Sequence, residues 1–287
     1  MKILALDTAT ENCSAALLID GSIRTREIEM ERGHAERILP MVDELLSEAS
    51  IVLTALDAIA FGRGPGSFTG VRLAATVTQG LAFGANLGVV PISDLQAVAQ
   101  RAFAVAAATG VVSIANTAAA TTTTAVVSAT PAAAPTTAIA GAGTATPAAT
   151  RATATATTPT RILVCNDARM SEVYWACFHR TDDGLARLEG EEHVSKPTDV
   201  RLPPEWTAAT TLGAGRGFRV YAAALQAAVP MANLDGPLTE LLPRAIEIAL
   251  LAVPEVAAGR LHPPEAAIPV YLRDNVAHVA QPSKPSR

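Results

Sequence analysis

The chain has 287 residues, enough for one large domain or two modest lobes, and its formal net charge of −5 argues against a broad basic face that grips nucleic acid by its phosphates. Apolar residues make up 49% of the chain and aromatic residues only 4%, so the core has to be built from alanine, valine, leucine and isoleucine, which suits an α/β protein. Three cysteines without a C-x-x-C pair exclude a disulfide framework. The sequence shows neither a signal peptide nor an apolar run of about eighteen residues. We therefore expect a soluble, cytoplasmic protein.

The first third of the chain alternates strands and helices. Three strands of a meander are predicted over residues 2–7, 13–20 and 22–30, with a tight turn at Asp20-Gly21. After Gly33, apolar residues three and four positions apart predict a helix. We expect Pro40 in the first turn of the regular part of that helix, because a proline inside a helix costs about 3 kcal/mol.

A glycine-rich segment, residues 62–70, follows a predicted strand at 57–61 and precedes an alanine-rich helix that ends near Ala85. It lacks the lysine of a Walker loop and the third glycine of a dinucleotide fingerprint. The free amides at the start of the helix could bind an anion. We favour the alternative, a tight connection in which Ser67 or Thr69 caps the helix.

The next strand is predicted at residues 89–92, with Ser93 as the N-cap of a helix through Phe103. Residues 1–103 are then expected to form an amino-terminal lobe with a mixed or parallel sheet. Residues 104–160 consist mainly of alanine and threonine without a helical or strand period, which predicts a disordered insertion. We expect a carboxy-terminal lobe over residues 161–280 and a tail over residues 281–287.

The segment from Ala5 to Thr10, with its acidic Asp7, resembles the opening of the actin, sugar-kinase and Hsp70 superfamily. More narrowly, three motifs resemble the TsaB family, also called YeaZ: they cover residues 61–72 (FGRGPGSFTGVR), 34–40 (HAERILP) and 166–174 (NDARMSEVY). The resemblance covers roughly residues 1–103 and 161–280. It implies an α/β fold with two actin-like lobes, each with a mixed sheet flanked by helices.

The resemblance implies a degenerate nucleotide site, and we assign it to Asp7, Thr8, Thr10, Gly213 and Gly215. Carboxylate and hydroxyl groups on a strand turn could hold phosphate or a metal-bound water, or they could satisfy the backbone of the hairpin. The glycines could approach a nucleoside or form a plain turn. We expect no required cofactor, and weak binding of ATP or ADP stays open.

No metal site and no catalytic residue are predicted. The five histidines form neither H-x-x-x-H nor H-E-x-x-H. In the related TsaD family an H-x-x-x-H metal motif follows the strand that corresponds to residues 89–92, and here Asp94 and Val98 stand in roughly those places. An autonomous ATP-dependent kinase or carbamoyltransferase and a metallopeptidase remain as alternatives, and the second is disfavoured.

The function implied by the resemblance is that of a non-catalytic partner for a TsaD-type enzyme, which transfers threonylcarbamoyl from its adenylate to N6 of adenosine-37 in tRNAs that read ANN codons. The implied partners are that enzyme, in a heterodimer, and a TsaE-type ATPase. Transfer RNA would be reached only through the complex, no membrane is involved, and a homodimer is an alternative when the partner is absent.

The wide apolar stripe of the first helix suggests that part of it faces outward, since exposed apolar surface marks interfaces. We therefore predict that the first helix docks the enzyme together with the helix after Gly70, through the residues Ile38, Met41, Val42, Leu45, Val71, Ala74 and Ala75. The alternative is a helix buried on two sides within its own lobe.

Overall fold

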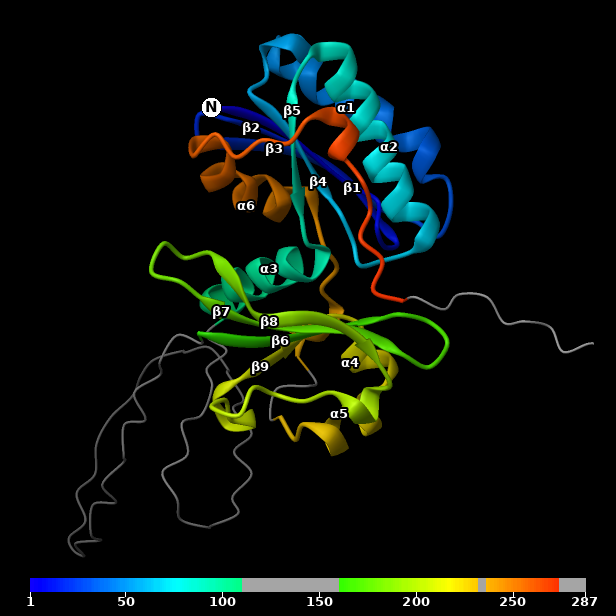
Figure 1. The fold of residues 1–287 in the computed structure, drawn as a ribbon, viewed down its shortest axis with the longest axis vertical. Helices are drawn as coiled ribbons and strands as arrows, with labels where there is room; N and C mark the ends of the chain where they lie inside the picture. The colour runs from blue at the N-terminus through cyan, green and yellow to red at the C-terminus, as the bar shows by residue number, and fades with distance from the viewer. Residues whose placement is uncertain (110–159, 232–235, 274–287) are drawn as a thin grey trace, which may run out of the picture.

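A computed structural model describes residues 1–109, 160–231 and 236–273, which form two lobes, each built on one mixed sheet (Figure 1). The sheet of the first lobe has the order β3-β2-β1-β4-β5. Its strands are β1 (Lys2–Asp7), β2 (Asn12–Ile19), β3 (Ser22–Glu29), β4 (Ala58–Gly62) and β5 (Gly88–Ile92). The expected two-lobed α/β class, with mixed sheets flanked by helices, is confirmed.

The first three strands form the predicted antiparallel meander. Asp20 and Gly21 both have positive φ, 46° and 88°, and form the predicted turn between β2 and β3. Strand β1 then pairs in parallel with β4, and β4 with β5. Because β1 and β4 are covered on both faces, nearly all of their residues are buried, which explains why both strands read as continuous apolar runs.

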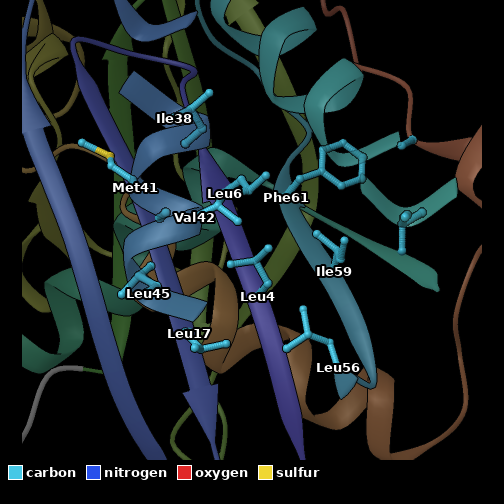
Figure 2. Packing of buried hydrophobic residues seen from close by; sticks show 14 of the residues in the cluster. Leu4, Leu6, Leu17, Ile38, Met41, Val42, Leu45, Leu56, Ile59 and Phe61 are labelled. Atoms are coloured by element: carbon cyan, nitrogen blue, oxygen red, sulfur yellow. The ribbon is translucent and has the colours of Figure 1, made fainter. Parts of the chain in front are cut away.

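Two helices, α1 (His34–Ala49) and α2 (Phe68–Ala85), cover one face of this sheet. Helix α1 begins just after Gly33, whose φ is 96°, so Pro40 lies inside the helix and its expected place in the first turn is wrong. The apolar side of α1 packs against leucines of β1 and β2 in the core shown in Figure 2. Helix α6 (Ala245–Ala257) covers the opposite face of the sheet.

The second sheet has the order β8-β7-β6-β9. Its strands are β6 (Arg161–Asp167), β7 (Val173–Arg180), β8 (Ala186–Ser195) and β9 (Leu212–Ala214). Helix α3 (Asp94–Thr109) packs on one face, and α4 (Gly217–Val220) and α5 (Ala222–Ala228) pack on the other. Strands β6 and β7 are antiparallel. Strand β8 was not predicted, because Gly190 and several charged residues interrupt the alternation of apolar and polar residues in it.

Each lobe contains one helix that the expected division of the chain assigns to the other lobe. Helix α3 precedes the second sheet in sequence but lies in the core of the second lobe, while α6 follows that sheet and lies in the core of the first lobe (Figure 1). The predicted lobes, residues 1–103 and 161–280, are therefore wrong as spatial units. The apolar side of α6 is buried against the face of the first sheet that α1 and α2 do not cover, and this burial stabilises the fold.

Helix α3 also extends beyond the predicted boundary at residue 104. It ends at Thr109, and Ala106 is fully buried among side chains of the second lobe. The rest of the predicted insertion, residues 110–159, and the predicted tail lie outside the described residues, so both stay predictions. No helix among residues 1–109, 160–231 and 236–273 is long and apolar enough to span a membrane.

Candidate functional site

The turn after β1 holds the first three residues assigned to a nucleotide site. Asp7 is fully buried, and its Oδ1 accepts a hydrogen bond from the backbone N–H of Ala9 at 2.8 Å. Thr8 donates its hydroxyl to the carbonyl oxygen of Gly70 at 2.7 Å. Of these three residues, only Thr10 lines the space between the lobes. The carbonyl oxygen of Thr10 lies 2.9 Å from Nε2 of His34. Asp7 and Thr8 thus bond to the chain's own backbone.

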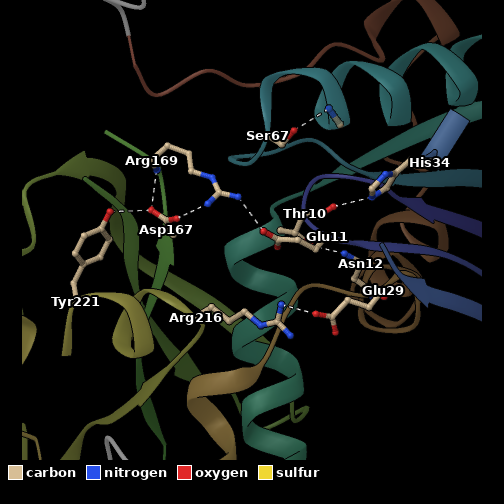
Figure 3. A network of polar contacts seen from close by, with 11 residues as sticks. Thr10, Glu11, Asn12, Glu29, His34, Ser67, Asp167, Arg169, Arg216 and Tyr221 are labelled. Carbon is tan, nitrogen blue, oxygen red and sulfur yellow. Dashed lines mark hydrogen bonds and ion pairs between the residues drawn. The ribbon is translucent and has the colours of Figure 1, made fainter. Parts of the chain in front are cut away.

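The glycine-rich loop packs directly against this turn. A Cβ atom added at Gly70 would lie 2.0 Å from the carbonyl oxygen of Thr8, and one added at Gly66 would lie 2.5 Å from that of Ala9. Ser67 donates its backbone N–H to Ala9 at 2.7 Å, and its hydroxyl caps α2 by accepting the N–H of Gly70 at 3.3 Å (Figure 3). The loop therefore forms the tight strand-to-helix connection that we favoured, with Ser67 as the cap.

The two glycines assigned in the second lobe lie at the end of β9. Gly213 is buried within this strand, and Gly215 follows it with φ of 95°. A Cβ atom at Gly215 would lie 2.5 Å from both Oδ1 of Asn166 and the carbonyl oxygen of Cys165. Gly215 is thus required for the close approach of β6. The side chain of Asn166 is 6% exposed, and both of its polar atoms lack a hydrogen-bond partner among the described residues.

A cavity of about 680 Å³ lies between the lobes. Its walls come from the β1–β2 turn and the end of β3 on one side, and from β6, its following turn and α4 on the other. The lining residues are Thr10, Glu11, Glu29, Met30, Glu31, Asn166, Asp167, Arg169, Arg216, Arg219, Val220 and Leu242. The structure brings Thr10 to this cavity and adds Asn166, whose position the motif at residues 166–174 already marked.

Ion pairs cross the cavity (Figure 3). Arg216 Nη1 lies 2.7 Å from Glu29 Oε1, and Arg169 Nη2 lies 3.1 Å from Glu11 Oε1. The hydrogen bond between Arg216 and Glu29 lowers the pKa of Glu29 and raises that of Arg216. Both glutamates are substantially exposed, so each pair contributes less than about 1 kcal/mol to stability. Two cationic groups that could hold a phosphate are therefore already paired with acids of the facing lobe.

The turn between β6 and β7 places Arg169 at the cavity with an uncommon backbone. Arg169, Met170 and Ser171 have consecutive φ values of 61°, 54° and 61°, in a region that non-glycine residues rarely occupy. Asp167 supports the turn by accepting the N–H of Arg169 at 2.8 Å, and Arg273 donates to the carbonyl oxygen of Ala168 at 3.1 Å. No local sequence signal predicts three left-handed residues in a row.

The predicted docking residues do not face outward. Ile38, Met41, Val42 and Leu45 are at most 3% exposed and lie in the core beneath α1 (Figure 2). Val71, Ala74 and Ala75 of α2 are equally buried. The expectation that Val42 and Leu45 point outward is wrong, because α1 packs against β2, β3 and α2 and so buries these two residues. The alternative, a helix buried within its own lobe, describes these residues.

The chain is similar to known proteins over its whole length. It is 34% identical over 284 residues to the tRNA threonylcarbamoyladenosine biosynthesis protein TsaB of Escherichia coli, covering 99% of this chain and 100% of that protein. This chain belongs to the TsaB family. The TsaB of Haemophilus influenzae is 58% identical over 104 residues, which is 36% of this chain and 44% of that protein. The predicted TsaB resemblance is confirmed.

A family model and solved structures agree with the TsaB assignment. The model of the TsaD family, tRNA N6-adenosine threonylcarbamoyltransferase, matches residues 28–128. The structure of YeaZ from Pseudomonas aeruginosa superimposes with a TM-score of 0.69 at 36% identity, covering 94% of this chain and 99% of that one. A second Pseudomonas aeruginosa structure, described as similar to the peptidase YeaZ, gives a TM-score of 0.70 at 36% identity, with 95% and 99% covered.

The positions of the TsaD metal motif hold buried residues in this TsaB-family chain. Asp94 and Val98 both have 0% exposure, and Val98 packs in the core of the second lobe. Within the described ranges, no group of three or more His, Cys, Asp or Glu side chains is arranged to hold a metal ion. Asp94 contacts Asp7 instead, which the sequence did not predict because the two residues lie far apart in the chain.

Proposed function

We propose that this chain is a non-catalytic subunit in threonylcarbamoyladenosine biosynthesis and acts by pairing with a TsaD-type enzyme that modifies adenosine-37 of tRNAs reading ANN codons. The observation that carries the proposal is the full-length likeness to the TsaB of Escherichia coli, which is named for this pathway. The match of the TsaD model to residues 28–128, which include α1 and α2, adds that this segment resembles the family of the proposed partner, so similar helices can meet in a quasi-symmetric pair.

The proposal includes indirect contact with tRNA and a third component. The net charge of −5 does not favour phosphate binding by this chain alone, so the RNA would be held by its partner. A TsaE-type ATPase joining the pair, and a homodimer in the absence of the partner, are parts of the same proposal. Co-purification from the native cell extract, with identification of the bound chains and RNA, tests the first two, and the oligomeric state of the purified chain alone tests the homodimer.

The cleft supports a non-catalytic role through the groups that already occupy it. Arg169 and Arg216, which line the cavity, are paired with Glu11 and Glu29, and Asp7 is buried outside the cavity lining and bonded to the chain's own backbone. A nucleotide would have to displace these ion pairs before its phosphates could meet the arginines. We therefore propose weak binding of ATP or ADP without turnover.

The purified chain is expected to release phosphate from ATP far more slowly than about 1 s⁻¹, the low end for ordinary enzymes, and to hold no stoichiometric transition metal. The double variant Glu11→Gln and Glu29→Gln removes the acids that pair with Arg169 and Arg216 across the cavity, although Asp167 and Glu240 still lie beside these arginines. It is expected to bind ADP about tenfold more tightly, a gain of about 1.4 kcal/mol. Phosphate release, elemental analysis and calorimetric titration measure these results. Turnover near 1 s⁻¹, or tightly bound zinc or iron, would instead support the alternative hypothesis of an autonomous kinase or carbamoyltransferase.

The docking surface is proposed on the outward side of α1 and α2, in place of the buried residues predicted from the sequence. Leu39 is 45% exposed on α1, and Phe83 is 79% exposed on α2. Gly80 and Gly84 are also exposed one turn apart on α2, and an added Cβ at either would meet nothing within 4 Å. Exposed apolar side chains beside small residues allow another helix to pack closely.

Leu39→Glu and Phe83→Glu are each expected to weaken binding to the TsaD-type enzyme of the same organism about 100-fold, because each places an unpaired carboxylate in the contact. Leu188→Glu is the matched control, since Leu188 is 38% exposed on β8 of the second lobe. Interferometry gives the affinities, and circular dichroism checks that all three variants fold. Unchanged affinity in both helix variants would exclude this surface.

A further inference from the structure

Two carboxyl groups are buried together beneath the glycine-rich loop. Asp7 ends β1 and Asp94 begins α3, and both have 0% exposure. A Cβ atom added at Gly62 would lie 2.3 Å from Oδ1 of Asp94 and 3.0 Å from Oδ1 of Asp7. The two acids therefore fill the space that the glycine leaves at the end of β4.

Each carboxyl has one satisfied oxygen and one without a donor. Oδ1 of Asp7 accepts the N–H of Ala9 at 2.8 Å, and Oδ2 of Asp94 accepts the N–H of Gly64 at 2.6 Å. Oδ2 of Asp7 and Oδ1 of Asp94 are buried and have no partner among the described residues. The two side chains lie within hydrogen-bonding reach of each other, but a carboxylate can only accept.

The surrounding charges do not neutralise the pair. Arg63 of the glycine-rich loop lies 3.0 Å from Glu192 of β8, and its charge lowers the pKa of Asp94 by less than burial and repulsion from Asp7 raise it. Glu247 of α6 adds negative charge, although it pairs with Arg244 at 2.6 Å. Cys13 of β2 is neutral near pH 7, because burial and the nearby Asp7 raise the pKa of its thiol to about 11. Two ionised carboxylates here would be buried without an adjacent free cation.

We propose that Asp7 and Asp94 share one proton around neutral pH, held between Oδ2 of Asp7 and Oδ1 of Asp94, and that this proton fastens the β1 turn to the start of α3. One proton satisfies both unpartnered oxygens. With no proton the two charges would repel each other in a site without water access, which costs free energy. The shared proton therefore makes the free energy of unfolding depend on pH.

The direction of this dependence follows from the pKa shifts. Burial raises the pKa of Asp7 to about 6, and burial together with repulsion from Asp7 raises the pKa of Asp94 well above its usual value. The unfolded chain loses both protons near pH 4, whereas the folded chain keeps one to a higher pH. The contribution of the pair to the free energy of unfolding is therefore fully present below about pH 4, and it is lost as the pH rises through the folded-state pKa values of the pair.

The test compares urea unfolding of the wild type with Asp94→Asn from pH 5 to pH 9. The ratio of their folding equilibrium constants is expected to change about tenfold per pH unit across the range where the folded wild type holds the extra proton. Asp94→Asn keeps an acceptor for Gly64 and gives Asp7 a permanent donor, so it is expected to be more stable than the wild type at pH 9. Asp43→Asn, on the exposed side of α1, is the control and should show a flat ratio.

A second measurement on the wild type alone does not depend on how a variant folds. In protein labelled with ¹³C at the aspartate carboxyls, two resonances are expected to titrate well above the usual range of an aspartate and to respond to each other. A flat stability ratio for Asp94→Asn, or aspartate resonances that all finish titrating below pH 5, would overturn the shared proton.

Discussion

Leu45→Glu is expected to lower the free energy of unfolding by about 4 kcal/mol, because the carboxylate would be buried without a partner and the leucine's packing would be lost. Leu45 has 0% exposure in the core that α1 forms with β1 and β2. Urea unfolding followed by circular dichroism measures the loss.

Leu39→Glu is the matched control on the same helix, since Leu39 is 45% exposed. Its free energy of unfolding is expected to stay within about 0.5 kcal/mol of the wild type. If Leu45→Glu were as stable as Leu39→Glu, the orientation of α1 described above would be wrong, and the original assignment of Leu45 to a docking surface would return.

Gly70→Ala is expected to destabilise the protein by about 3 kcal/mol, because overpacking at this site cannot be relieved by moving a flexible side chain. The added Cβ would lie 2.0 Å from the backbone oxygen of Thr8, so the β1 turn and the start of α2 would have to separate. Thermal unfolding reports the loss, and weakened partner binding should accompany it if α2 shifts.

Gly80→Ala provides the opposite control within the same helix. Nothing lies within 4 Å of an added Cβ there, and alanine favours the helix by about 1 kcal/mol over glycine, so this variant should be more stable than the wild type. Equal effects of the two substitutions would show that the turn and α2 are not packed as described.

The sequence predicted most strands and helices because their patterns are local. The Asp20-Gly21 turn, the buried strand β4 and the cap at Ser67 each depend on residues that are neighbours in the chain. The family was predictable for the same reason, since its motifs are continuous segments.

The remaining features depend on contacts between distant residues. The width of the apolar stripe of α1 does not show which of its residues are buried. Only the packing of α1 against β2, β3 and α2 shows that Val42 and Leu45 are covered while Leu39 stays exposed. The contact of Asp7 with Asp94 and the ion pair of Arg216 with Glu29 likewise join residues that the fold brings together. Their individual residue types gave no signal.

The exchange of α3 and α6 between the lobes also sets the order in which the protein can fold during synthesis. When residue 109 leaves the ribosome, all five strands of the first sheet exist, but the face that contacts Ile248 and Ala252 is bare. That face stays bare until α6 has been made, after the whole second sheet. We therefore expect the nascent first lobe to be a chaperone substrate, and a fragment ending at Arg244 to aggregate.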